Sequence, residues 1–189
     1  MQIGMVGLGR MGGNMARRLM KGGHEVVAYA RDAESVKQLA REGATGTTTL
    51  DDFVGKLKTP RTAWVMVPAG AATEQVIMDL AARVVPGDTI IDGGNSFYKD
   101  DVRRMKTLKE KRIHHVDVGT SGGVWGIERG YCLMIGGEKE VVRRLDPVFK
   151  TLAPGSATCR ARPDARSWAG RRSTATCTAA RRAPATSSR

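Results

Sequence analysis

Three glycines near the N-terminus have a spacing that suits the binding of a pyrophosphate. Gly7, Gly9 and Gly12 form a Gly-x-Gly-x-x-Gly pattern directly after an apolar segment at residues 2–6. The first permits a tight strand-to-helix turn, the second lets the backbone approach a phosphate, and the third lets the next helix pack closely on the strand. The predicted binding turn comprises Gly7, Leu8, Gly9, Arg10, Met11 and Gly12.

The segments around this turn favour dinucleotide binding over a purely structural role. A helix is expected at residues 10–22, with Met11, Met15 and Leu19 on one face, and a second strand at residues 25–30. The free amides and positive dipole end of this helix point at the position of the phosphates. Strand, turn, helix and strand together predict a βαβ unit.

The same alternation continues along the chain. Further strands are expected at residues 63–67, 88–92, 113–118 and 131–135. Further helices are expected at residues 32–41, 73–84, 99–111 and 138–152, the last one bent by Pro147. Alternating elements with short connections predict an α/β fold with a doubly wound, mostly parallel sheet of the Rossmann type.

Three later segments carry a resemblance to a known family. Ile-Asp-Gly-Gly-Asn-Ser-Phe-Tyr-Lys-Asp starts at residue 91, Asp-Val-Gly-Thr-Ser-Gly-Gly at 117, and Gly-Tyr-Cys-Leu-Met-Ile-Gly-Gly at 130. With the glycine turn, they resemble the coenzyme domain of a decarboxylating 6-phosphogluconate dehydrogenase over residues 1–155. Gly-Gly-Asn-Ser at residues 93–96 favours this subfamily among the β-hydroxyacid dehydrogenases. The resemblance implies oxidation of 6-phosphogluconate by a nicotinamide cofactor and loss of carbon dioxide to leave ribulose 5-phosphate, in the pentose phosphate pathway.

Polar residues at the ends of two predicted strands suit that chemistry. Ligands of open α/β sheets bind beyond the carboxyl ends of the strands, where Asn95 and Ser121 lie. The Asn95 amide can donate and accept at once, so it suits a bridge between the nicotinamide ribose and a sugar-acid hydroxyl. A turn that uses Asn and Gly for backbone reasons is the alternative. By the resemblance, Asn95 contacts cofactor and substrate, and the other substrate contacts are Ser121, Gly122 and Gly123.

Cofactor choice depends on the residues after the second predicted strand. Sites that prefer NAD commonly place an acid there, which accepts from the ribose 2′-hydroxyl and repels a 2′-phosphate. Here Arg31 can pair with a 2′-phosphate, which favours NADP and leaves NAD as the alternative. Asp32 either caps the next helix or reaches the ribose. Val67, Pro68 and Ala69 are expected to form a wall against the cofactor, or else only a buried strand end.

Other candidate groups indicate structure rather than chemistry. His114 and His115 are adjacent on a strand, so they point to opposite faces and cannot easily chelate one metal ion. These two residues and His24 are expected in the core or on the surface, and no metal site is predicted. The basic run at residues 99–112 is expected to be a solvated helix face, with attraction of a phosphorylated substrate as the alternative.

The net charge of +12 is concentrated at the C-terminus. Residues 156–189 contain eight arginines and one acid, and they lack Ile, Leu, Val, Phe and Met. Such a segment cannot bury enough apolar surface to offset its chain entropy, so a disordered basic tail is expected there. Nucleic-acid binding is disfavoured, because Trp168 is the tail's one aromatic residue and no binding fold is recognisable.

Composition also bounds the cellular context. No run approaches the roughly 18 apolar residues of a membrane span, and no signal peptide is evident. Cys132, Cys159 and Cys177 show no metal-ligand spacing and no even framework, so the cytoplasm is the expected location. The expected partner is a small phosphorylated sugar acid, without membrane contact.

The resemblance also implies residues that this sequence lacks. An acid–base lysine, a glutamate and the helical domain that forms most of the dimer interface would follow the coenzyme domain, but no lysine follows Lys150. We therefore expect no catalytic residue here and little or no activity of the chain alone. The composition changes at Gly155, which suggests a reading-frame change near Ser156. A non-catalytic NADP-binding module that works with another chain is the alternative function.

Overall fold

The computed structural model describes residues 1–155, and the disordered tail expected at residues 156–189 lies outside this range. The strands are β1 (Gln2–Val6), β2 (Glu25–Tyr29), β3 (Thr45–Gly46), β4 (Thr62–Val65), β5 (Thr89–Asp92), β6 (His114–Ser121) and β7 (Cys132–Gly137). The longer helices are α1 (Arg10–Lys21), α2 (Ala33–Arg41), α4 (Ala71–Ala81) and α5 (Tyr98–Glu110). The shorter helices are α3 (Leu50–Lys56), α6 (Gly126–Arg129), α7 (Lys139–Arg144) and α8 (Asp146–Leu152), with a 3₁₀ turn, η1, at Gly123–Trp125.

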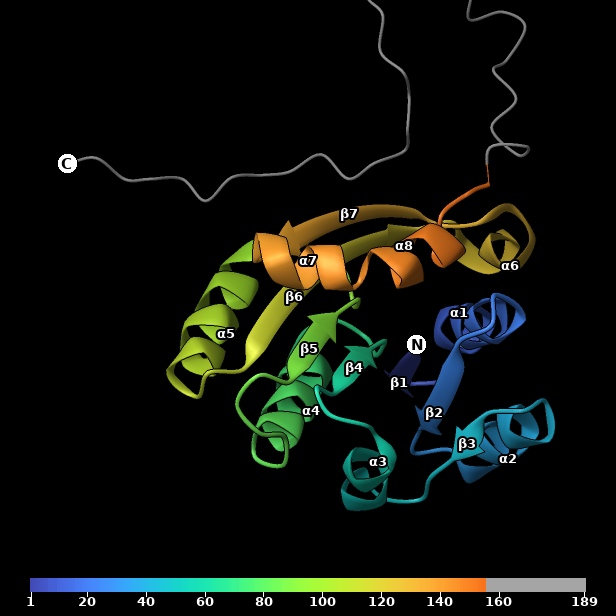
Figure 1. The fold of residues 1–189 in the computed structure, drawn as a ribbon, viewed down its shortest axis with the longest axis horizontal. Helices are drawn as coiled ribbons and strands as arrows, with labels where there is room; N and C mark the ends of the chain where they lie inside the picture. The colour runs from blue at the N-terminus through green and yellow to red at the C-terminus, as the bar shows by residue number, and fades with distance from the viewer. Residues whose placement is uncertain (156–189) are drawn as a thin grey trace, which may run out of the picture.

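One seven-stranded sheet organises the described residues, in the order β3-β2-β1-β4-β5-β6-β7 (Figure 1). Neighbouring strands from β3 to β6 are parallel, and β7 is antiparallel to β6. The chain starts in the middle of the sheet, grows to one edge and then crosses back to grow to the other. This order is the Rossmann type of doubly wound sheet, and it confirms the predicted fold class.

Helices cover both faces of the sheet (Figure 1). On one face, α1, α7 and α8 pack on β1, β4 and β6 through a core that includes Met15, Leu19, Trp64, Leu145 and Val148. On the other face, α3, α4 and α5 enclose a second core that includes Phe53, Ile77, Leu80, Ile90 and Leu108. The strands are therefore apolar on both faces, as expected for a buried parallel sheet.

The last described residues are fastened to α1 and α6. The Arg18 guanidinium donates to Thr151 O and Ala153 O, each at 2.8 Å, and to Ile127 O at 3.1 Å. At Gly130, a Cβ atom would lie only 2.4 Å from Pro154 N, so the chain can pass there because residue 130 is glycine. One side chain of the first helix thus binds the backbone of the last helix and of the residue after it, in addition to their packing in the core.

The structure differs from the sequence prediction in several short elements. The expected helix at residues 138–152 is broken at Leu145 into α7 and α8, and Pro147 lies in the first turn of α8. Proline suits the first turn of a helix because its missing N–H would have no partner there. The elements β3, α3, η1 and α6 were not predicted. Among the described residues, no helix has the length and apolarity needed to cross a membrane.

Candidate functional site

The predicted glycine turn links β1 to α1 and is tightly packed at its two ends. Gly7 has φ +94°, and a Cβ atom there would lie 2.4 Å from Met66 O. A Cβ atom on Gly12 would lie 2.0 Å from Gly7 O. Both positions therefore require glycine for the close contact of β1, α1 and the end of β4.

The middle glycine faces open space instead. A Cβ atom on Gly9 would meet nothing within 4 Å, and Gly9 caps α1 without any side-chain hydrogen bond to the helix amides. The first turn of α1 contains no acidic residue. The amides at the start of α1 are thus available to an anion, and an adjacent cavity of about 310 Å³ is lined by Leu8, Gly9, Arg10, Asn14 and Arg17, among others.

Arg31 and Asp32, which follow β2, have different surroundings in the structure. The Asp32 carboxylate accepts from the amides of Glu34 and Ser35, each at 3.2 Å, and so caps α2. The hydrogen bond from the Ser35 hydroxyl is the main cause of a lowered pKa of Asp32. Arg31 is exposed and lines a second cavity, of about 320 Å³, together with Lys37. Asp32 is therefore used by the helix, whereas Arg31 faces the cavity.

The end of β4 lies between the glycine turn and the loop after β5. Val67 is half-buried, and its Cγ1 would lie 2.9 Å from a Cβ atom on Gly7. Its carbonyl oxygen would lie 2.9 Å from a Cβ atom on Gly94. Pro68 and Ala69 are exposed. The alternative to a cofactor wall, a buried strand end, therefore does not describe these two residues.

Asn95, in the loop after β5, is held by the neighbouring strand. It has φ +55°, a conformation that asparagine adopts more readily than most residues. Its Oδ1 accepts from Thr120 N at 2.9 Å, and its Nδ2 donates to Thr120 O at 3.1 Å. Each of these amide atoms retains one further hydrogen-bonding capacity, and the residue is exposed.

The Ser-Gly-Gly segment directly follows Thr120. Ser121 ends β6, and Gly122 and Gly123 have φ values of +146° and +52°. The chain then turns through η1 toward α1, where Asn14 Nδ2 donates to Val124 O at 3.4 Å. This contact places the Ser121–Gly123 segment near the helix that begins at the glycine turn.

The sheet order brings these segments together. The strands β1, β4, β5 and β6 are consecutive neighbours and parallel, so the segments that follow them lie at one edge of the sheet. Arg31 lies at the same edge, after β2, on the other side of β1. This edge is where open α/β sheets bind their ligands.

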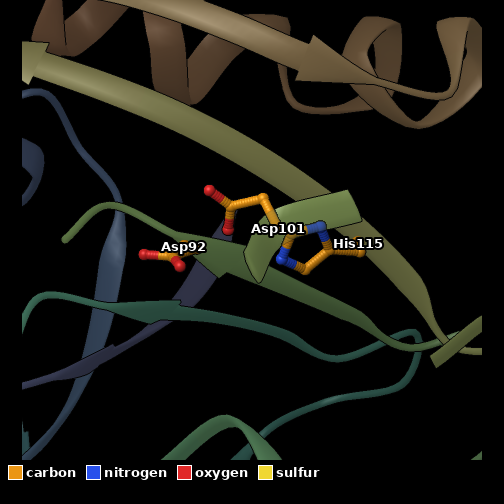
Figure 2. Close-up of side chains that lie close together, drawn as sticks. All are labelled: Asp92, Asp101 and His115. Carbon is orange, nitrogen blue, oxygen red and sulfur yellow. The ribbon is translucent and has the colours of Figure 1, made fainter. Parts of the chain in front are cut away.

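A group of buried ionisable side chains lies under the loop after β5. Asp92 from β5, Asp101 and Arg104 from α5 and His115 from β6 form this buried charge cluster, and Figure 2 shows three of them side by side. Arg104 is 1% exposed and donates to Asp92 at 2.8 Å, to Asp101 at 3.1 Å and to Glu74 at 2.7 Å. Three elements of the fold, β5, α4 and α5, therefore meet at one guanidinium.

Burial changes the pKa values in this cluster. Desolvation, reinforced by the nearby Asp92 carboxylate, raises the pKa of Asp101 to about 7. Desolvation lowers the pKa of His115 to about 4. Asp117, next to them on β6, has a pKa raised mainly by burial. At neutral pH, His115 is therefore neutral, and Asp101 takes up a proton at a much higher pH than an exposed aspartate does.

The cluster also has the composition of a metal site. Ligand atoms of Asp92, Asp101 and His115 lie within 4.8 Å of one another. However, the Arg104 guanidinium bonds to both carboxylates and already supplies their positive charge. His114 points elsewhere, with its Nδ1 2.8 Å from Glu138 Oε2, and His24 Nε2 lies 2.9 Å from Thr151 Oγ1.

Sequence reasoning missed this cluster and misplaced one of its members. The expected solvated basic face of residues 99–112 is wrong for Arg104, which is fully buried. The neighbouring Arg103 is exposed and forms a two-pronged ion pair with Glu74. A usable signal was present, because Asp101 and Arg104 are three residues apart on one helix face, after an aspartate at a strand end.

Comparisons with known proteins agree with this geometry. A family profile described as the NAD binding domain of 6-phosphogluconate dehydrogenase matches residues 2–161. An NAD⁺-dependent decarboxylating 6-phosphogluconate dehydrogenase of Haloferax volcanii is 40% identical over 155 residues, which are 82% of this chain and 51% of that protein. The NADP⁺-dependent enzyme of Bacillus subtilis is 37% identical over 156 residues, covering 80% of this chain and 33% of that protein.

Solved structures of dehydrogenases are also similar to this chain. The chain superposes on Plasmodium falciparum 6-phosphogluconate dehydrogenase, described with NADP⁺ and with 6-phosphogluconate, with a TM-score of 0.77 and 28% identity, over 84% of this chain and 35% of that one. A Mycobacterium tuberculosis 3-hydroxyisobutyrate dehydrogenase shares the fold, with a TM-score of 0.74 and 24% identity, over 80% of this chain and 52% of that one. The chain spans about half the length of these relatives, or less. It belongs to the 6-phosphogluconate dehydrogenase family and carries that family's NAD-binding domain.

Proposed function

We propose that this chain binds NADP, or NAD, at the carboxyl edge of its sheet and serves the oxidative decarboxylation of 6-phosphogluconate to ribulose 5-phosphate. The observation that carries the proposal is the open space at Gly9 beside the uncapped start of α1. A pyrophosphate fits such a position, because backbone amides and the helix dipole both stabilise negative charge. The bound nicotinamide would accept the hydride from the sugar acid.

Each predicted contact has a role in this proposal. The turn from Gly7 to Gly12 holds the pyrophosphate, and the segment from Val67 to Ala69 lies against the dinucleotide. The remaining capacity of the Asn95 amide bonds the nicotinamide ribose and a substrate hydroxyl. Ser121, Gly122 and Gly123 offer one hydroxyl and unobstructed amides to the substrate carboxylate. The approach of Asn95 to Thr120, at 2.9 Å, supports a shared site for cofactor and substrate.

The end of β2 supports NADP over NAD. The Asp32 carboxylate accepts from the amides of Glu34 and Ser35 and so is engaged in the cap of α2, which supports a structural role over a bond to a ribose 2′-hydroxyl. Arg31 is exposed at the same strand end and can pair with a 2′-phosphate through two parallel hydrogen bonds.

We further propose that the coenzyme domain, residues 1–155, has little or no activity by itself. The family resemblance implies that the acid–base lysine and the protonating glutamate lie after this domain. A general acid or base contributes roughly a hundredfold to ten-thousandfold to the rate, and its absence lowers the rate by this factor. The reading-frame change near Ser156 and the cytoplasmic location remain predictions from composition.

Two measurements test the proposal. The purified chain should bind NADP⁺ in a fluorescence or calorimetric titration, and should form almost no ribulose 5-phosphate from 6-phosphogluconate. Appending the helical part of a relative in frame after Gly155 should restore turnover. Absence of both NADP⁺ and NAD⁺ binding would contradict the cofactor assignment. Rapid turnover by the chain alone would redirect attention to Lys99 as a substitute base.

A second candidate, a binding module that works with another chain, is favoured by one observation. Large apolar side chains are exposed on the described residues, at Phe97, Tyr98, Val102, Met105, Val124, Trp125 and Met134. Phe97 and Tyr98 directly follow the loop of Asn95, and Val124 and Trp125 directly follow Gly123. Exposed apolar groups beside a binding site suit contact with a further protein segment. Mixing the chain with the helical part of a relative, made separately, distinguishes the two candidates, because only the second expects turnover without fusion.

A further inference from the structure

Asp92 bonds both chain neighbours of Asn95. Its Oδ1 accepts from Gly94 N at 2.8 Å, and its Oδ2 accepts from the Ser96 hydroxyl at 2.7 Å. Asn95 stands between these two attachments with φ +55°. A single buried carboxylate therefore fixes the loop on either side of the residue that the proposed function places against the nicotinamide ribose.

Arg104 in turn fixes the carboxylate. Its guanidinium bonds Asp92 Oδ2 at 2.8 Å and, through its other contacts, spans to Glu74 on α4 and Asp101 on α5. Arg104 and Asp92 are each 1% exposed. Because a guanidinium is planar and rigid, its bonds to several carboxylates hold them at defined distances and angles.

Thr120 supplies the third attachment. Its N–H and C=O both pair with the Asn95 amide, so the side chain is oriented by β6 while the backbone is oriented by Asp92. Thr120 directly precedes Ser121 in the proposed substrate segment. The orientation of Asn95 and the position of the Ser121–Gly123 segment are therefore linked.

We propose that Asp92 and Arg104 are positioning residues, which aim Asn95 at the nicotinamide end of a bound dinucleotide from beneath the Gly93–Ser96 loop. This inference rests on the proposed function. The buried ion pairs act through loop geometry and do not touch the cofactor. Ordered attachments of this kind make a binding group effective, because small displacements of it weaken its hydrogen bonds.

The test compares two ligands on the full 189-residue chain. NADP⁺ contains the nicotinamide half, whereas adenosine 2′,5′-bisphosphate lacks it. Ser96→Ala removes one attachment of the loop and keeps the ion pairs of Arg104. Asp92→Asn removes the negative charge and leaves one acceptor oxygen for the bonds from Gly94, Ser96 and Arg104. Asp100→Asn is the matched control. Asp100 lies in the first turn of α5, the helix of Arg104, and among the ion pairs of the described residues it pairs only with Arg103.

The expected result is a selective loss. Ser96→Ala should weaken NADP⁺ binding about fivefold to tenfold, the size expected from one lost hydrogen bond, while binding of the bisphosphate stays the same. Asp92→Asn should show at least that loss if it folds, and Asp100→Asn should show none. Equal weakening of both ligands, or of neither, by Ser96→Ala would overturn the inference. If the unmodified chain binds neither NADP⁺ nor NAD⁺, the proposed function itself fails.

Discussion

The turn after β1 and the loop after β5 lie at the same edge of the sheet but are held by different interactions. In the turn, glycines allow backbone to touch backbone, and Gly9 leaves its surroundings open. In the loop, buried charges from β5 and α5, joined by the partly exposed Glu74 of α4, hold the backbone, with Asp92 accepting from Gly94 N and the Ser96 hydroxyl. The turn depends on glycines that have no side chain, whereas the loop depends on side chains, such as Glu74 and Arg104, that are far apart in the sequence.

This difference determines how each region should respond to change. A backbone turn depends on a few local positions, so its function can be lost while the rest of the fold stays intact. A buried charge cluster couples distant elements, so changing one member leaves others without partners in a medium of low dielectric constant. A substitution at Gly9 should therefore separate binding from stability in the turn, whereas substitutions in the cluster should affect stability first.

The largest effect is expected at Gly9. Gly9→Val should abolish dinucleotide binding, because the new side chain would fill the space proposed for the pyrophosphate, and the melting temperature should change little. Titration with NADP⁺ and thermal unfolding measure the two effects. Gly12→Ala is the contrasting control, since its Cβ atom would lie 2.0 Å from Gly7 O and should destabilise the fold. Unchanged affinity in Gly9→Val would refute the assigned turn.

Two neighbouring arginines on α5 give the next largest contrast. Arg104→Met should destabilise the chain by about 3–5 kcal/mol, because it leaves buried carboxylates without their cation. Arg103→Met should cost less than about 1 kcal/mol, because its ion pair with Glu74 is exposed at the arginine. Urea unfolding of both variants measures the difference. Equal losses would mean that burial does not decide the effect.

Opposite pKa shifts predict opposite pH dependences within the cluster. The folded-state pKa of His115 is about 4, below its ordinary value near 6.5, so its contribution to stability is lost as pH falls through this interval. The folded-state pKa of Asp101 is about 7, above its ordinary value near 4, so its contribution is present at low pH and lost as pH rises toward 7. The two changes oppose each other in the unmodified chain.

Replacing either His115 or Asp101 should leave the pH dependence of stability that comes from the other residue. Relative to the unmodified chain, His115→Gln should gain up to about 3 kcal/mol of unfolding free energy between pH 7 and pH 4, at about 1.4 kcal/mol per pKa unit. Asp101→Asn should shift in the opposite direction over the same interval. Denaturant unfolding at a series of pH values measures both curves. If the stability of both variants changed in the same way with pH, the opposite pKa shifts of His115 and Asp101 would be contradicted.

The smallest predicted effect concerns cofactor selectivity. Arg31→Ala should weaken NADP⁺ binding by about 1.5–3 kcal/mol, the range for hydrogen bonds to charged groups, and leave NAD⁺ binding nearly unchanged. Arg41→Ala, at the far end of α2, serves as a control for the lost positive charge. Calorimetric titration with both cofactors measures the change. Equal losses for NADP⁺ and NAD⁺ would show that Arg31 does not meet the 2′-phosphate.

Local patterns in the sequence were sufficient to predict most of the fold. The strand before Gly7, the capping residue Asp32 and the apolar strand near Trp64 each act through neighbours in the chain, so their patterns are visible without a structure. The strand β3 was missed because it contains only two residues, Thr45 and Gly46, which pair with β2 through tertiary contact. Short elements of this kind carry too few residues to show a period.

The site was predictable to the extent that it depends on backbone. The glycine turn and the positions of Asn95 and Ser121 at strand ends followed from spacing and from the family resemblance. The burial of Arg104 did not, because its partner Glu74 is 30 residues away and meets it only after α4 and α5 pack on the sheet. The two bonds between Asn95 and Thr120 likewise require β5 and β6 to be adjacent.

The fastening of the last described residues by Arg18 has a consequence for any segment attached after them. Because the carbonyls of Thr151 and Ala153 are held to α1, a fused polypeptide would start from a fixed point beside the first helix. This anchored start would set the effective concentration of the fused polypeptide at the sheet edge. Each residue added to a flexible spacer would lower that concentration, because the tether becomes longer. The position of the junction, as much as the identity of the fused part, should therefore govern how well the two halves cooperate.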